Sequence, residues 1–332
     1  MIKQGYDCDL LIVVVTFNSE KYIEECLQSI VHLVEHLDNI LISVCVVDNS
    51  SSDSTREKLR RFETKYHWLN LILSERNVGF GSANNLAFEN YAAKAYFLLN
   101  VDAYFIGDSI STAYRYLESA ENVGILGLSM VYPSGAPQTS SFVYSSWHSW
   151  LLFLLGFKGI AIFLLRFGFV RWVAQRLHYT REFSRLHNQN KSSIPAPKTY
   201  NRQLRSSNEI RNVDWVSGAA MLLSRKFLQD SEGFDHRIFL YGEDEDLCIT
   251  AKRLSYSVEA IDTVPVVHYL GWERAGFRKE VSFLKFSSLK YFINKNIKSR
   301  FNRALMRIIL PFYVFGSRAP MLIVWAVLRW KK

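Results

Sequence analysis

Between Leu10 and Leu128 the sequence alternates short runs of β-branched and aromatic residues with longer stretches of helical periodicity. Such alternation is typical of a parallel β-sheet whose strands are joined by helices lying on its faces. Strands are predicted at residues 10–15, 42–47, 69–73, 96–99 and 123–128. The expected fold class is therefore α/β, with a mostly parallel sheet and helices on both of its faces.

The first connecting segment has the clearest helical pattern. Apolar residues recur at steps of three and four from Ile23 to Leu37, which places them on one face of a helix. Ser19 stands just before this stretch, and serine is a favourable N-cap residue because its side chain can accept a hydrogen bond from the first turn. We expect a helix capped by Ser19 that packs its apolar face on the sheet.

Polar residues follow the first four predicted strands at the points where those strands end. They are Thr16 and Asn18, Asp48 and Asn49, Asn77, and Asn100 and Asp102. The carboxyl ends of parallel strands meet at one edge of a sheet, and ligands of such folds bind there. Each of these residues is also a common turn or cap residue, but four sets at one edge predict a ligand site.

A nucleotide held without a standard phosphate loop is the expected ligand. The chain contains no GxxxxGK[ST] loop, and Gly79-Phe80-Gly81 lacks a third glycine and follows the third predicted strand. These departures argue against kinase, NTPase and dehydrogenase functions. Asp48 can accept hydrogen bonds from a base or ribose, and the glycines of NVGFGSANN allow backbone to approach a ligand closely.

Asp102 and His268 are the candidate metal ligands. Asp102 follows FLL and Asn100, so its carboxylate is expected at the tip of the fourth strand. His268 ends a strand-like run at residues 264–267 and is expected to complete the same site. Carboxylate oxygens suit Mg²⁺ or Mn²⁺ bridging a diphosphate. Either residue alone is more often structural.

Glu243, Asp244, Glu245 and Asp246 form a run of four acids directly before a predicted helix. The helix dipole favours acids in a first turn, which accounts for one or two of them. Four adjacent like charges cost free energy unless some bind a metal or face a proton-bearing substrate. The run therefore predicts an acid–base group, with a stabilised helix start as the ordinary alternative.

The net charge of +9 is concentrated in two apolar segments. Residues 166–211 contain ten Lys and Arg against two acids, and residues 279–332 contain twelve against one. No nucleic-acid-reading motif occurs, so nucleic acid is not an expected partner. Interleaved aromatic and cationic residues favour helices lying in an anionic membrane interface, with core helices as the alternative. The candidate anchors are Trp147, Trp150, Trp172 and Tyr179.

The cysteines and the N-terminus favour a cytoplasmic setting. Cys8, Cys26, Cys45 and Cys248 show no close pair and no nearby histidine cluster, which suits neither a disulfide framework nor a structural zinc site. The apolar run at residues 10–15 is flanked by Asp7 and Asp9, unlike a signal peptide. It is expected to be a buried strand.

Seven ordered motifs together resemble the family-two glycosyltransferases of GT-A fold. They are VVVTFNSEKYIEECLQSI, VVDNSSSDST, NVGFGSANNLA, LLNVD, VDWVSGAAMLLSR, GFDHRIFLYGEDEDLC and VVHYLG. Within that family the sequence is most similar to the bacterial rhamnosyltransferase-like branch that builds surface polysaccharides. The resemblance covers roughly residues 9 to 271, and it implies a Rossmann-like nucleotide-binding half within a GT-A domain.

The resemblance implies a nucleotide-sugar pocket, a metal site and a general base. The pocket residues would be Thr16, Asn18, Asp48, Asn77, Gly79 and Asn84. Asp102 would be the last acid of the DXD metal motif, whose first acid is Asn100 here, and His268 a further ligand of Mg²⁺ or Mn²⁺. Asp244 would be the general base, with Glu243 and Asp246 shaping its surroundings.

The implied reaction is a single displacement that inverts the anomeric carbon of a nucleotide sugar, with dTDP-L-rhamnose as first choice and a UDP-sugar as the other. The implied acceptor is an undecaprenyl-diphosphate-linked glycan of O-antigen, capsule or cell wall, met by a peripheral enzyme on the cytoplasmic face of the inner membrane. Predicted parts are a nucleotide-sugar half at 1–129, a basic insert at 130–212, an acceptor half at 213–278 and membrane-associating helices at 279–332.

Two other functions remain open. A sugar nucleotidyltransferase can share the sheet, but such enzymes carry a glycine-rich basic loop after the first strand, where this chain has TFNSEK. A non-catalytic, membrane-bound nucleotide-sugar binder would account for Asn100 in place of an acid. The complete acid run argues against that alternative.

Overall fold

The computed structural model describes residues 7–37, 39–154, 207–270 and 279–315. The chain divides into two compact units, one of residues 1–144 with 197–277 and one of residues 145–196 with 278–332. Trp172, Tyr179 and most of the predicted basic insert lie outside the described residues. The four parts expected from the sequence, with their three boundaries, stay predictions.

The first unit is built on a sheet that has ten strands within the described residues. Its main path consists of β1 (Cys8–Thr16), β2 (Ile42–Asp48), β3 (Leu69–Leu73), β4 (Ala93–Asn100), β5 (Ala103–Phe105), β6 (Val123–Val131), β11 (Ala220–Ser224) and β12 (Ser257–His268). They lie in the order β3-β2-β1-β4-β11-β6-β12-β5. Two short strands, β7 (Pro137–Gln138) and β9 (Ile210–Asn212), pair with β6 and β12. A separate pair joins β8 (Ser141–Phe142) to β10 (Trp215–Val216).

Most long strands of this sheet run in one direction. β1 is parallel to β2 and to β4, and β2 is parallel to β3. β11 is antiparallel to both β4 and β6, so β6 runs with β4, and β12 is parallel to β6. The predicted α/β class with a mostly parallel sheet is confirmed, and the five predicted strands are all present.

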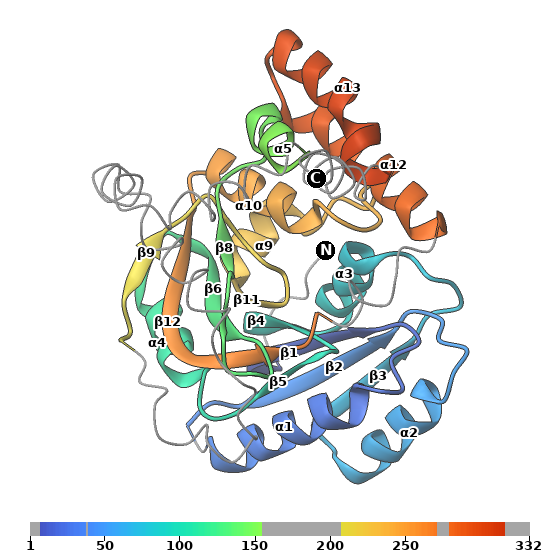
Figure 1. The fold of residues 1–332 in the computed structure, drawn as a ribbon. Coiled ribbons are helices and arrows are strands. Elements are labelled where there is room, and N and C mark those ends of the chain that lie inside the picture. Colours follow the sequence, from blue (N-terminus) through green and yellow to red (C-terminus); the bar gives the residue numbers. More distant parts are fainter. Residues whose placement is uncertain (1–6, 38, 155–206, 271–278, 316–332) are drawn as a thin grey trace, which may run out of the picture. The chain divides into compact units, whose positions relative to one another are not determined.

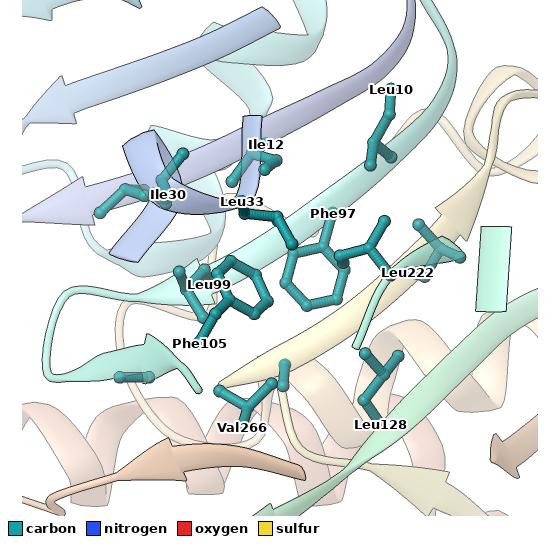
Figure 2. Close-up of a cluster of buried hydrophobic side chains, with 14 of the residues drawn as sticks. Leu10, Ile12, Ile30, Leu33, Phe97, Leu99, Phe105, Leu128, Leu222 and Val266 are labelled. Carbon is teal, nitrogen blue, oxygen red and sulfur yellow. The ribbon is translucent and has the colours of Figure 1, made fainter. Parts of the chain in front are cut away.

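Helices cover both faces of the sheet, as the alternation of strand residues requires. Leu10, Ile12 and Val14 of β1 pack in one core with the helices α1 (Ile23–His36), α2 (Thr55–Lys65) and α4 (Ser111–Ser119). Leu11 and Val13 point to the opposite core, which contains α3 (Phe80–Asn90), α9 (Arg225–Ser231) and α10 (Glu243–Arg253). Figure 1 shows α1 and α2 below β1 to β3 and α3 above them, and Figure 2 shows part of the first core, where Phe97 and Leu222 lie among the side chains of α1 and its neighbours.

The apolar face predicted for α1 is buried, but Ser19 does not cap the helix. The N-cap residue is Tyr22, and no side-chain cap hydrogen bond is formed. The hydroxyl of Ser19 pairs instead with the backbone N–H and carbonyl of Phe17, at 3.2 Å in both cases. Its own carbonyl accepts hydrogen bonds from the N–H groups of Tyr22 and Ile23, so Ser19 supports the first turn through its backbone.

The second unit, as far as it is described, consists of α5 (Trp147–Leu154), α12 (Lys279–Asn296) and α13 (Arg300–Phe315). Trp150 is buried and stacks on the ring of Tyr313 with the centroids 4.5 Å apart. Trp150 is therefore a packing residue of this unit, not an interfacial anchor. None of the described helices is long and apolar enough to cross a bilayer.

Candidate functional site

The polar residues that follow β1, β2 and β4 lie side by side because of the strand register. Thr16 is the partner of Asp48 in the parallel pair of β1 and β2, and Val15 is the partner of Asn100 in the pair of β1 and β4. β6 and β12 run in the same direction and end at Val131 and His268. The carboxyl ends of these strands therefore form the common edge that the sequence predicted.

Asp48 is fully buried at the end of β2 and is held by three hydrogen bonds. Thr16 Oγ1 donates to Oδ1 at 3.0 Å, and the backbone N–H of Ser51 donates to Oδ2 at 3.0 Å. Arg56, from α2, forms an ion pair with Oδ2 at 2.6 Å and also donates to the carbonyl of Ser74. Arg56 was not identified from the sequence, where it reads as one cation among several on an exposed helix. Any ligand that uses Asp48 must share it with this guanidinium.

Asn18 joins the loop after β1 to the loop after β2. Its backbone N–H donates to Ser51 Oγ at 2.8 Å, and its side-chain oxygen accepts from the N–H of Ser52 at 2.8 Å. The residue has a φ of 49°, a left-handed conformation that asparagine adopts more readily than most residues. Asn18 thus fixes the two loops that follow β1 and β2 against each other, whether or not a ligand also contacts it.

Asn77 and Gly79 shape the loop that precedes α3. Asn49 Nδ2 donates to Asn77 Oδ1 at 2.8 Å, and Asn77 Oδ1 also accepts from the N–H of Gly79. Gly79 has a φ of +88°, and a Cβ atom there would lie 2.4 Å from the carbonyl oxygen of Phe239. This glycine therefore allows a close backbone approach to the chain's own loop at Phe239, which the sequence did not indicate, and its expected approach to a ligand stays a prediction.

Asn84 is the pocket candidate with unused hydrogen-bonding capacity. It lies on α3 and is 1% exposed. Its Nδ2 donates to the carbonyl of Phe80 at 3.0 Å, but its Oδ1 has no partner. A buried amide oxygen without a donor is costly, so a donor group of a ligand would satisfy it.

The pairing of β5 with β12 brings Asp102 and His268 together. His268 is the strand partner of Ala103, the residue after Asp102, and the N–H of Tyr269 donates to the carbonyl of Asp102 at 3.0 Å. His268 Nε2 lies 3.2 Å from Asp102 Oδ1, and both residues are 4% exposed. Asn100 Nδ2 lies 3.3 Å from the same ring nitrogen. The sequence placed these three residues at one site, and the structure does the same.

Gln138, from the two-residue strand β7, contacts the other ring nitrogen of His268. Its Oε1 lies 3.1 Å from His268 Nδ1. No sequence signal pointed to Gln138, because a strand of two residues has no periodicity and its pairing with β6 is non-local.

The donor set at Asp102 fits a hard divalent cation that is held only partly by protein. Asp102 offers a carboxylate oxygen and His268 a ring nitrogen, whereas Asn100 turns its amide Nδ2, a hydrogen-bond donor, toward the ring. Among the described residues no group of three or more His, Cys, Asp and Glu side chains converges on one point. Mg²⁺ commonly binds through one or two carboxylates, with waters and substrate phosphates completing its shell. This chain provides that kind of partial site.

Asp244 lies in the first turn of α10, which begins at Glu243, so the acid run is part of the helix. Glu243, Glu245 and Asp246 are buried, whereas Asp244 is half-buried and keeps access to solvent. Its Oδ2 accepts from the N–H of Gly218 at 3.4 Å, and its Oδ1 accepts from the N–H of Glu245 at 2.9 Å. Of the four acids, Asp244 is the one best placed to meet a substrate.

Gly218 and Ala219, which precede β11, connect Asp244 to the Asp102 region. The N–H of Gly218 contacts Asp244, and the carbonyl of Ala219 accepts from the N–H of Asn100 at 3.0 Å. This link exists because β11 inserts beside β4 in the antiparallel sense, so that its start meets the end of β4. Asp102, His268 and Asp244 are thus assembled around one end of the β4–β11 pair.

Two neighbouring acids of the run, Glu243 and Asp244, hold their protons more tightly than ordinary carboxyls. Burial raises the pKa of Asp244 to about 6. Burial and the charge of Asp244 raise the pKa of Glu243 further. Glu243 Oε2 is buried and has no hydrogen-bond partner, which agrees with this direction. Leu247 and Ala251 of α10 are buried, whereas Leu254, directly after the end of the helix at Arg253, is 40% exposed.

A family model described as Glycosyl transferase family 2 matches residues 11–153. This stretch includes the ends of β1, β2 and β4 and the Asn100–Asp102 turn. The matched stretch, termed the family 2 segment, is less than half of the chain. The match ends before Asp244 and His268, so it does not assign roles to those two residues.

A curated relative of the family 2 segment is the rhamnosyltransferase WbbL of Escherichia coli (strain K12), which is 31% identical over 128 residues. The alignment covers 37% of this chain and 44% of the relative. The chain thus spans less than half the length of this curated relative. The family match and the relative support a transferase.

Solved structures of glycosyltransferases share the fold. The mannosyltransferase PcManGT from Pyrobaculum calidifontis, solved with GDP-Man and Mn²⁺, has a TM-score of 0.52 at 16% identity over 98% of this chain and 79% of its own. S. aureus TarS, solved with UDP-GlcNAc, has a TM-score of 0.51 at 14% identity over 94% of this chain and 73% of its own. The family 2 segment is therefore part of a GT-A fold.

Proposed function

We propose that this chain is an inverting glycosyltransferase that moves a sugar from a nucleoside diphosphate to an acceptor hydroxyl. Two observations at the edge formed by the family 2 segment support the proposal. Asp102 contacts His268 next to the end of β4, and backbone hydrogen bonds of Gly218 and Ala219 link Asp244 to Asn100. In such a reaction the group that holds the nucleoside diphosphate and the base that accepts the proton need to be adjacent. Asp102 and His268 would supply the first, and Asp244 the second.

The nucleotide would lie over the ends of β1 and β2. Thr16 and Asp48 form the floor of that pocket, and Asn18 holds its rim. Asn77 and Gly79 order the neighbouring loop, and the unpartnered Oδ1 of Asn84 offers an acceptor for a ligand donor group. Buried polar groups that are partly unsatisfied favour a polar ligand such as a base or ribose.

Asp102 and His268 would hold a divalent metal, Mg²⁺ or Mn²⁺, with Asn100 beside them. Two of the fold relatives contain Mn²⁺. When bound, such an ion neutralises the charge that grows on the departing diphosphate. Asn100 replaces the first acid of the expected motif, so this chain would direct one carboxylate fewer at the ion and rely more on phosphate oxygens and water.

Asp244 would act as the general base. Its raised pKa is closer to neutrality than that of an ordinary aspartate, which strengthens it as a base. The N–H groups of Gly218 and Glu245 orient its carboxylate. As the acceptor oxygen attacks the anomeric carbon, its proton passes to Asp244 and the bond to the diphosphate breaks. Glu243 and Asp246 shape the surroundings of this carboxylate from buried positions.

L-Rhamnose carried by dTDP is the proposed donor, with a UDP-sugar as the alternative. The curated relative is a rhamnosyltransferase, and the motif pattern is most similar to the same branch. The acceptor we propose is a glycan on undecaprenyl diphosphate, in O-antigen, capsule or cell-wall synthesis.

The second unit supports an enzyme that works at the cytoplasmic face of the inner membrane as a peripheral protein. Phe301, Ile308, Phe312 and Phe315 lie on one side of α13 and are 67%, 64%, 62% and 49% exposed. Phe283 of α12 contacts Phe315 and is also exposed. Residues 279–332 carry twelve Lys and Arg against one acid. Exposed aromatic residues with surrounding cations favour an anionic bilayer surface.

A transfer assay tests the proposed function. The full chain is incubated with Mn²⁺, radiolabelled dTDP-rhamnose, UDP-sugars or GDP-sugars, and lipid-linked glycan acceptors. Label in the lipid fraction with an inverted anomeric configuration is the expected result. Nucleotide-sugar synthesis from sugar phosphate and NTP would replace the proposal by a nucleotidyltransferase, and donor binding without turnover across all acceptors would replace it by a binder.

Membrane binding is tested separately by flotation with anionic liposomes. The full chain should float at low salt and less at high salt, and Phe312→Ser should float less than the wild type. Leu41→Ser, which alters an equally exposed apolar residue of the first unit, is the matched control and should float normally. Equal recovery of all proteins with neutral and anionic liposomes contradicts the membrane part.

A further inference from the structure

The side chain of Gln138 has a fixed place beside His268. β7 pairs with β6 so that Gln138 is the partner of Met130, and β6 in turn pairs with β12 so that Met130 is the partner of Val266. Three neighbouring strands therefore bring the two residues together. Gln138 Oε1 lies 3.1 Å from His268 Nδ1; Gln138 is half-buried and His268 is buried.

The contact constrains which ring nitrogen of His268 carries the proton. An amide oxygen only accepts hydrogen bonds, so His268 Nδ1 must be the donor to Gln138. In the neutral ring Nε2 then has a free lone pair. Asn100 Nδ2, a donor, lies 3.3 Å from Nε2, which suits that state.

The other neighbour of Nε2 points to a cation. Asp102 Oδ1 lies 3.2 Å from Nε2, so an electron pair of the ring faces a carboxylate oxygen. Two such atoms repel each other unless a metal ion or a proton on Nε2 lies between them, and the ring state measured below separates these two cases. The same two atoms are donors that a divalent metal accepts.

We propose that Gln138 is a positioning residue that holds His268 in the Nδ1-protonated form and so directs the Nε2 lone pair at the metal beside Asp102. The metal part rests on the proposed function, whereas the tautomer of His268 does not. A partner on the second nitrogen of a metal-binding histidine fixes its tautomer and orientation, and losing such a partner commonly weakens metal binding by about 10- to 100-fold.

The tautomer is measured on the metal-free, full-length protein by ¹⁵N-detected long-range NMR of the histidine rings at a pH where they are neutral. His268 is assigned by the signals lost in His268→Gln, since the chain has eight histidines. The expected spectrum has a protonated Nδ1 and an unprotonated Nε2. A protonated Nε2 in the wild-type protein overturns the proposal.

Metal binding is measured by Mn²⁺ EPR in the presence of dTDP. Gln138→Leu removes the acceptor and should weaken Mn²⁺ binding by about 10- to 100-fold, whereas Gln138→Glu keeps an acceptor and should bind Mn²⁺ within a few-fold of the wild type. Equal weakening by both variants, or by neither, overturns the proposal. If Gln138→Leu does not fold, the wild-type tautomer and the Gln138→Glu affinity still decide.

The two hypotheses fail in different ways. A wild-type protein with the expected tautomer that binds no Mn²⁺ contradicts the metal step of the proposed function, and with it the metal part of this inference. A wild-type protein that binds Mn²⁺ with the opposite tautomer contradicts the role of Gln138 and leaves the transferase proposal in place.

Discussion

His268 Nε2 lies 3.2 Å from Asp102 Oδ1, although the two residues are far apart in the sequence. The antiparallel pair of β5 and β12 creates this contact, because it sets His268 opposite Ala103. Asp102 therefore owes its position to a three-residue strand that directly follows it. The same turn carries Asn100, so one long-range strand pairing brings the expected metal motif and its histidine together.

Removal of the metal should abolish transfer. EDTA is expected to stop turnover, and added Mn²⁺ to restore it, because charge on the departing diphosphate would otherwise be neutralised too weakly. His268→Ala should raise the Mn²⁺ concentration needed for half-maximal rate. His67→Ala, at an exposed histidine, is the control and should behave as the wild type. Full activity in EDTA would exclude the metal site.

Glu243→Gln should stabilise the protein at neutral pH. Burial and the charge of Asp244 raise the pKa of Glu243, so the folded state holds its proton more tightly than the unfolded state does. The wild-type protein is therefore most stable below the pKa of glutamate in the unfolded state, about 4.3. It loses stability as the pH rises from there through the raised pKa of the folded state. Removing the charge should raise the free energy of unfolding by more than about 1 kcal/mol at pH 8.

The gain from Glu243→Gln should disappear below about pH 4, where the carboxyl is protonated in both states. Thermal unfolding across pH measures this directly. Glu35→Gln, at an exposed position, should change the melting temperature little at any pH. A pH-independent gain in Glu243→Gln would show that its charge is not the cause.

Gly79→Ala should destabilise the fold by roughly 1–3 kcal/mol, the range for a residue forced into a disfavoured backbone conformation. Its φ of +88° is unfavourable for alanine, and the new Cβ would meet the backbone oxygen of Phe239. Gly107→Ala is the comparison, because its Cβ would meet only a side-chain methyl of Val264 at 3.3 Å. Urea unfolding of both variants is the measurement, and equal losses would contradict the stated role of Gly79.

The rate of transfer should fall on the acid side. Asp244 accepts a proton only when ionised, and burial raises its pKa to about 6. The turnover number should therefore decrease below about pH 6 while the protein remains folded. A rate that stays constant down to pH 5, with saturating donor and acceptor, would show that Asp244 is not the base.

The sequence predicted the strands and the edge they form because those features depend on local patterns. Short runs of β-branched, aromatic and other apolar residues located β1, β2 and β4. Asp48 and Asn100 stand at the ends of such runs, and this placed them at strand ends. Arg56 and Gln138 escaped prediction because their contacts depend on non-local packing of α2 and β7.

A local pattern misled at the start of α1. Ser19 has the chemistry of an N-cap, but its hydroxyl is already engaged by the backbone of Phe17, so the helix begins later. A competing intramolecular contact, which the sequence does not reveal, determined the outcome. The close approach of Gly79 to Phe239 is a second contact of this kind, and the ligand contact expected at Gly79 stays a prediction.

The kinetics of Asp244→Asn test the central proposal most directly. Donor affinity is measured by calorimetry with the nucleotide sugar and Mn²⁺, and turnover by transfer of labelled sugar to the acceptor. Asn keeps the shape of the side chain and loses its basicity, so turnover should fall by about 10²- to 10⁴-fold with donor affinity unchanged. Wild-type turnover in Asp244→Asn would contradict the account.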